Sequence, residues 1–73
     1  MNPIKADPEI MHGTPCFAGT RVPVASLFDH LKHGYNVDYF IYQFPTVNRQ
    51  HIEEVLEMAE RLVAPPPAQR AAG

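Results

Sequence analysis

The sequence predicts a mostly α-helical fold, in which a compact unit of three helices follows a short N-terminal β-hairpin arm. Three stretches carry apolar residues at positions i, i+3 and i+4, the spacing that places side chains on one face of a helix. The connections between these stretches are short, as in compact helical units. Residues 13–24, rich in Gly, Pro and Thr, separate the helical part from an irregular N-terminal segment.

Length and composition limit the class of protein. The chain has 73 residues and a formal net charge of −2, so we expect one small domain with a marginal core. Association into a homodimer would add stability. Cys16 is the single cysteine, and without a signal-like apolar run it favours a cytoplasmic protein. No apolar run approaches the ~20 residues that span a membrane.

The N-terminal part predicts an arm and a hairpin. Residues 1–8 contain two prolines and predict a flexible arm. Residues 9–22 predict a β-hairpin, with strands at 9–12 and 16–18 and a turn that contains Gly13 and Pro15. A two-stranded hairpin is barely stable alone, so it must pack on the helices or pair with a second chain.

The first helix is predicted at about residues 23–33. Pro23 suits the first helical position, where its missing N–H costs no hydrogen bond. Gly34 follows the last turn as a C-terminal cap. The apolar stripe of this helix consists of Val24, Leu27, Phe28 and Leu31.

Two further helices are predicted at 37–44 and 48–63, within a single domain of residues 9–63. Asn36 and Asn48 are suitable N-caps, and Pro45 ends the first of the two. Their short connection has the spacing of a helix-turn-helix. The Pro- and Ala-rich residues 64–73 predict a disordered tail. The apolar stripes are Val37, Phe40, Ile41 and Phe44, then Ile52, Val55, Leu56, Ala59, Leu62 and Val63.

Several motifs together resemble the domain-of-unknown-function 433 (DUF433) family over about residues 7–62. They are the Asp-Pro arm at 7–10, Gly-Thr-Pro at 13–15, Gly-Thr-Arg-Val-Pro-Val at 19–24 and Phe-Pro at 44–45. The resemblance implies a homeodomain-like, winged-helix-related helix-turn-helix fold with a β-arm, commonly dimeric. It also implies a VapB-type antitoxin that binds a PIN-like ribonuclease toxin and represses its own operon by binding operator DNA.

The start of the third helix is the candidate DNA-binding end. Asn48, Arg49, Gln50 and His51 stand where the family usually has Thr-Pro followed by acids. Arg can read guanine, and Asn or Gln can read adenine, by paired hydrogen bonds. The alternative is an N-cap followed by solvated polar residues, and the carboxylates further along the helix would be repelled by phosphate.

Arg21 and Lys32 complete the predicted DNA-binding set. For Arg21 a structural role is preferred, in which it fixes the arm to the body by pairing with Asp7, Glu9 or Asp38.

The candidate partner-binding residues are three tyrosines and two glutamates. Tyr35, Tyr39 and Tyr42 lie off the apolar stripe, and tyrosines in such positions are typical interface anchors. Glu53 and Glu57 belong to an acidic face of the third helix that could dock on a basic toxin. The alternatives are that the rings fill the core and that the carboxylates form an ordinary solvated face.

No motif for catalysis or cofactor binding is present in the sequence. The histidines and Cys16 lack the four closely spaced ligands of a zinc site, so neither an enzyme, a metal, a cofactor nor a small-molecule substrate is expected. The predicted function is a type II antitoxin that neutralises a PIN-like ribonuclease and binds operator DNA. The alternatives are a stand-alone DNA-binding transcriptional regulator and a protein-interaction module without DNA binding.

Overall fold

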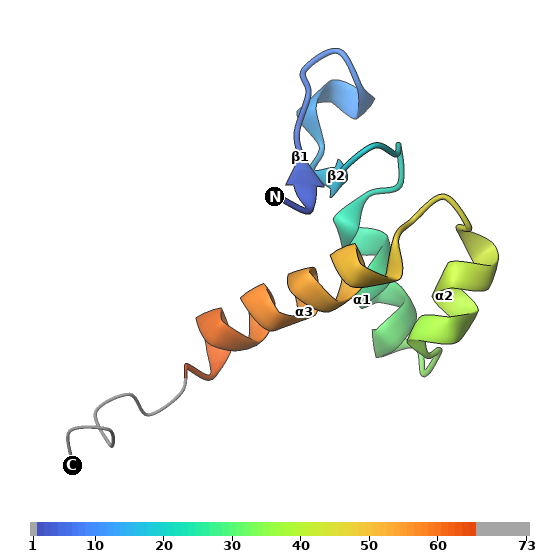
Figure 1. Cartoon of the computed structure of the whole chain (residues 1–73), viewed down its shortest axis with the longest axis vertical. Helices are drawn as coiled ribbons and strands as arrows, with labels where there is room; N and C mark the ends of the chain where they lie inside the picture. The colour runs from blue at the N-terminus through green and yellow to red at the C-terminus, as the bar shows by residue number, and fades with distance from the viewer. Residues whose placement is uncertain (1, 66–73) are drawn as a thin grey trace.

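A computed structural model describes residues 2–65 of the chain. It contains two short strands, one 3-10 turn and three α-helices (Figure 1). The mostly α-helical fold with a small N-terminal hairpin is therefore confirmed. None of the helices in the described part combines the length and apolarity that crossing a membrane requires. The elements are β1 (Ile4–Lys5), η1 (Met11–Gly13), β2 (Cys16–Phe17), α1 (Val24–Lys32), α2 (Val37–Gln43) and α3 (Arg49–Val63).

The hairpin forms from different residues than the sequence suggested. β1 pairs antiparallel with β2, so that Ile4 lies opposite Phe17 and Lys5 opposite Cys16. Residues 1–8 are therefore not simply a flexible arm, because they contain one of the two strands. The prediction of a strand at 9–12 is wrong as well, since part of that stretch lies in the 3-10 turn η1.

Local hydrogen bonds explain why residues 9–12 turn instead of extending. The Asp7 carboxylate accepts a hydrogen bond from the Glu9 amide at 2.9 Å, and the Asp7 carbonyl accepts one from the Ile10 amide at 2.8 Å. This side-chain-to-backbone turn competes with extended structure. Met11 and His12 then adopt positive φ angles of 53° and 56°, which no strand residue has. The first strand of the hairpin therefore lies at Ile4–Lys5, nearer the N-terminus than the predicted strand at 9–12.

Residues 13–24 join the hairpin to α1. The Phe17 amide donates to the Val22 carbonyl, and the Val24 amide donates to the Pro15 carbonyl, each at 3.0 Å. The Thr20 hydroxyl donates to the Phe17 carbonyl and accepts from the Val22 amide. Pro23 lies just before α1 in an extended conformation, one residue earlier than expected. These bonds hold the hairpin against the start of the first helix.

The helices begin and end at the residues that their capping chemistry favours. The Asn36 side chain accepts from the Tyr39 amide at 2.8 Å, and the Asn48 side chain accepts from the Gln50 amide at 2.7 Å. Gly34 follows α1 with a φ of 89°, a conformation that glycine adopts without steric cost. Of the predicted tail at 64–73, all but Ala64 and Pro65 lies outside the described residues.

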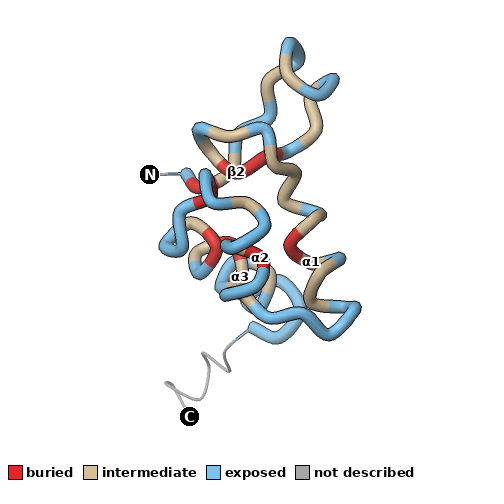
Figure 2. The backbone as a smooth tube through the Cα atoms, turned by 90° about the vertical axis from the view of Figure 1, so that its right-hand side faces the viewer, coloured by how far each residue is buried: buried red, intermediate tan, exposed pale blue. Residues whose placement is uncertain are grey.

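The core draws on the hairpin and on every helix. Figure 2 shows buried segments in β2 and in each of the three helices. The Phe17 ring of the hairpin lies against the Phe40 ring of α2, with centroids 5.9 Å apart. The hairpin is thus part of the packed body. The core cluster consists of Phe17, Leu27, Phe40, Val47, Ile52 and Val55.

Candidate functional site

The side chains at the start of α3 are largely engaged within the chain. Asn48 caps the helix, and Arg49 forms an ion pair with Asp38 of α2. The Gln50 side chain donates to Glu54 at 3.4 Å, and His51 is half-buried. Asn48, Arg49 and Gln50 are still exposed to solvent, so a phosphate could reach them only by competing with these local partners.

The surface that follows along α3 is acidic. A shallow hollow along the helix is lined by Gln50, Leu56 and four glutamates. Glu57 pairs with Arg61 at 3.1 Å, one turn further on. A helix with this face would meet phosphate repulsion beyond its first turn in a DNA groove. The four glutamates are Glu53, Glu54, Glu57 and Glu60.

The other two predicted DNA-binding residues lie on other elements. Lys32 is the last residue of α1, and Arg21 lies in the turn between β2 and α1. Both are exposed. Arg21 forms no ion pair with any residue in 2–65, so the predicted pairing with Asp7, Glu9 or Asp38 is wrong. Asp38 pairs with Arg49 instead, because α2 and the start of α3 lie side by side.

The three tyrosines lie at the surface. Tyr35, Tyr39 and Tyr42 are 48%, 39% and 79% exposed, so they do not fill the core. Phe40 occupies the buried position of α2 between them. The alternative in which α2 is buried on more than one side is therefore wrong.

The tyrosine rings form one continuous surface. The rings of Tyr35 and Tyr39 are stacked, with centroids 4.6 Å apart and an interplanar angle of 17°. The Tyr42 ring follows, 6.4 Å from Tyr39 between centroids. Gln43 donates a hydrogen bond of 2.9 Å to the Tyr39 hydroxyl. We call Tyr35, Tyr39 and Tyr42 the tyrosine surface.

His30 links the tyrosine surface to the core, a role that the sequence did not suggest. Its ring lies beside those of Tyr35 and Tyr39, with centroids 5.8 and 6.2 Å away, and packs edge-on against Phe40 and Phe44. Its Nδ1 donates to the Ser26 carbonyl at 2.8 Å, which fixes the ring. The only sequence signal for this role is the aromatic content of residues 35–44. The rings of Tyr35 and Tyr39 therefore pack against a His30 ring that is held in place by its hydrogen bond.

The glutamates predicted to contact a partner lie on a different element. Glu53 and Glu57 belong to α3, and no hydrogen bond or ion pair within residues 2–65 joins them to the tyrosine surface. In the same part of the chain, no three His, Cys, Asp or Glu side chains come together as a metal site would require.

Comparison with known protein families gives one match. A family model described as "Protein of unknown function (DUF433)" matches residues 4–59, which is most of the chain. The match covers the hairpin, α1, α2 and α3 as far as Ala59. No curated protein and no solved structure matches the chain.

Proposed function

The chain belongs to the DUF433 family, and on that basis we propose that it is the antitoxin of a type II toxin–antitoxin pair. It acts in the cytoplasm as a homodimer that binds and neutralises a PIN-like ribonuclease. The observation that carries this proposal is the tyrosine surface, in which three exposed rings lie in contact on one side of a small domain.

The tyrosine surface has the features of a protein-binding anchor. Tyrosine is enriched at binding hot spots because its large ring gains contact area while its hydroxyl stays hydrogen-bonded. The stack between Tyr35 and Tyr39 and the hydrogen bond from Gln43 hold the rings before a partner arrives. Little side-chain freedom is then lost on binding, which favours affinity.

The acidic face of α3 supports a ribonuclease as the partner. An enzyme that cleaves RNA must present cationic groups to the phosphate backbone. The carboxylates of Glu53 and Glu57 would be attracted to such a surface and would steer the encounter. In this complex the tyrosine surface would supply most of the affinity, and the acidic face would orient the ribonuclease as it binds.

Operator DNA is a second proposed ligand, limited to the first turn of α3. The exposed side chains of Asn48, Arg49 and Gln50 favour it. The pairing of Arg49 with Asp38 and the glutamates beyond the first turn oppose it. Between the two alternative functions, these features favour a protein-interaction module over a stand-alone transcriptional regulator.

Co-purification from native cells tests the proposal. The full chain, tagged at its N-terminus, is isolated from cells that express it at its natural level, and co-eluting proteins are identified by mass spectrometry. The proposal expects a PIN-like protein in a fixed ratio to the chain. A chain that elutes without a PIN-like protein, in cells that express one from a neighbouring gene, contradicts it.

A further inference from the structure

The end of α3 exposes apolar side chains beyond the core. Leu62 and Val63 are 84% and 82% exposed, and Met58 is 47% exposed. The α3 residues that pack in the core extend only to Leu56. Figure 1 shows α3 running out from the body of the molecule. Within residues 2–65 nothing covers this apolar helix end, and such an exposed apolar surface is typical of a contact with another chain.

The same helix end carries a carboxylate that no cation within residues 2–65 pairs with. Arg61 pairs with Glu57, whereas Glu60 forms no ion pair with any described residue. Glu60 is exposed and lies one turn before the exposed Val63, on the same side of the helix. A surface that complements this helix end must therefore combine an apolar hollow with positive charge.

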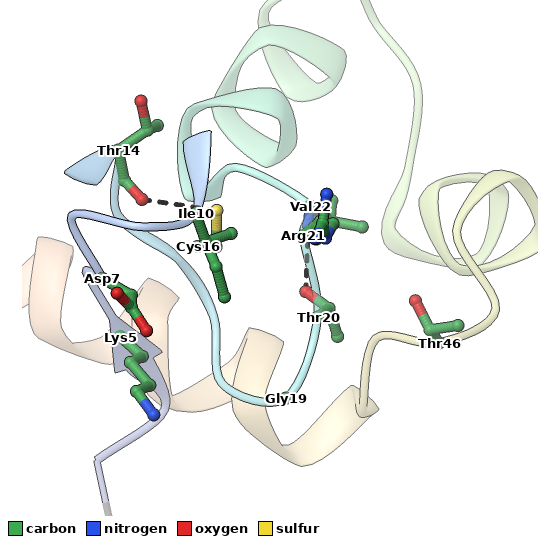
Figure 3. Close-up of a pocket in the computed structure, with 10 residues that line it drawn as sticks. All are labelled: Lys5, Asp7, Ile10, Thr14, Cys16, Gly19, Thr20, Arg21, Val22 and Thr46. Carbon is green, nitrogen blue, oxygen red and sulfur yellow. Dashed lines mark hydrogen bonds between the residues drawn. The ribbon is translucent and has the colours of Figure 1, made fainter. Parts of the chain in front are cut away.

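A pocket beside the hairpin has this combination (Figure 3). Its volume is about 650 Å³. Apolar lining comes from Ile10, Cys16 and Val22, and the exposed cations Lys5 and Arg21 stand on opposite sides of it in the view of Figure 3. Asp7 also lines the pocket, on the Lys5 side. Arg21, which pairs with no described carboxylate, remains available to an incoming one.

The helix end cannot reach the pocket of its own chain. Figures 1 and 2 both place the hairpin and the end of α3 toward opposite ends of the long axis of the molecule. α3 is one continuous helix from Arg49 to Val63, so it does not bend back. A second copy of the chain, in contrast, can offer its helix end to this pocket and receive the first copy's helix end in return.

We infer that the end of α3 docks reciprocally in the hairpin pocket of a second copy. Leu62 and Val63 enter the apolar part, and Glu60 pairs with Arg21 of the other copy. Two equal contacts related by a two-fold axis close the assembly as a dimer and leave no open end for further growth. This inference rests on the homodimer of the proposed function and assigns its interface, which does not involve the tyrosine surface.

Sedimentation equilibrium of the full chain over a range of concentrations tests the interface. Wild type is expected to form a dimer, and Leu62→Ser and Arg21→Glu are each expected to raise the dimer dissociation constant at least tenfold. Both residues are exposed, so far-UV circular dichroism should show that the variants stay folded. Tyr42→Ala is the matched control and should dimerise as wild type does.

A charge exchange between two variants tests the pairing itself. Glu60→Arg alone should weaken the dimer, as Arg21→Glu does. In a mixture of the two variants, each contact of the mixed dimer again joins opposite charges, so dimerisation is expected to return. A monomeric wild type, a dimer that Arg21→Glu leaves unchanged, or a mixture that stays monomeric overturns the inference.

The outcome is separable from that of the proposed function. A monomer that still binds the PIN-like ribonuclease overturns the dimer interface alone. A dimer with the expected charge dependence that does not bind the ribonuclease overturns the proposed function alone.

Discussion

The ring of Tyr35 stacks on the ring of Tyr39 at 4.6 Å between centroids, although both side chains are more than one-third exposed. Tyr35 lies in the loop between α1 and α2, and Tyr39 lies in the first turn of α2, which the Asn36 side chain caps. The cap therefore sets the helix phase that brings the two rings together. The surface that we propose to bind the toxin therefore depends on the capped N-terminus of α2.

Loss of a tyrosine ring should weaken toxin binding without unfolding the domain. Tyr39→Ala and Tyr42→Ala are each expected to cost about 2 kcal/mol, or roughly 30-fold in affinity, as is usual for an aromatic hot spot. Isothermal titration with the PIN-like ribonuclease measures the effect. Tyr42→Phe keeps the ring and serves as the control. Unchanged affinity in both alanine variants would place the contact elsewhere.

Release of Arg49 should strengthen DNA binding. Asp38→Ala removes the partner of Arg49 and one negative charge, whereas Arg49→Ala removes the cation. With DNA from upstream of the gene, fluorescence anisotropy should show tighter binding for the first variant and weaker binding for the second. The dependence on log salt concentration should steepen by about one for the first variant.

The control for the Arg49 experiment is Asp29→Ala. It removes one exposed carboxylate from α1 without freeing Arg49. If it strengthens DNA binding as much as Asp38→Ala does, the effect is one of net charge. Equal affinities for wild type, Asp38→Ala and Arg49→Ala would exclude the start of α3 as the DNA contact.

Removal of the α3 cap should lower stability. The Asn48 side chain accepts from the Gln50 amide at 2.7 Å, so Asn48→Ala leaves that donor without its partner. The expected loss is about 1 kcal/mol in the free energy of unfolding, measured in urea. Asn48→Asp should recover most of it, because Asp also caps and its charge suits the helix dipole. A loss of equal size in both variants would contradict the capping role.

The hairpin and the helices should unfold together. Phe17 is fully buried and lies against Phe40, so Phe17→Ala is expected to cost about 3–5 kcal/mol. That is a large share of the ~5–15 kcal/mol that stabilises a typical domain. Thermal melting followed by circular dichroism should show loss of the helices at a much lower temperature. Retention of the wild-type helical melt would mean that the hairpin is not part of the core.

The helices could be predicted from the sequence because each has its own local signals. Each predicted segment contains a stripe of apolar residues and has an Asn cap, a Gly or a Pro at or next to its ends, and the observed bounds follow these signals closely. The hairpin could not be predicted in the same way. Its strands are two residues long, too short to show an alternating pattern, and the turn at Asp7 shifts the pairing to Ile4.

Only those features of the candidate site could be predicted that follow from which side of a helix a residue occupies. Tyr39 and Tyr42 lie outside the apolar stripe of α2 to which Phe40 belongs, so their exposure follows from that stripe. The pairing of Arg49 with Asp38 and the contacts of His30 depend on how separate helices pack. No pattern within one element reports such contacts, so the partner of Arg49 could not be predicted from the sequence.

Inhibition of RNA cleavage tests the central claim most directly. A PIN-like ribonuclease that co-purifies with the chain is incubated with a labelled RNA, and the cleavage rate is measured as the purified chain is added. The account expects cleavage to fall in proportion to the chain until it stops, and Tyr42→Ala to require a higher concentration. Cleavage that continues at its full rate in an excess of folded wild-type chain would contradict the antitoxin function.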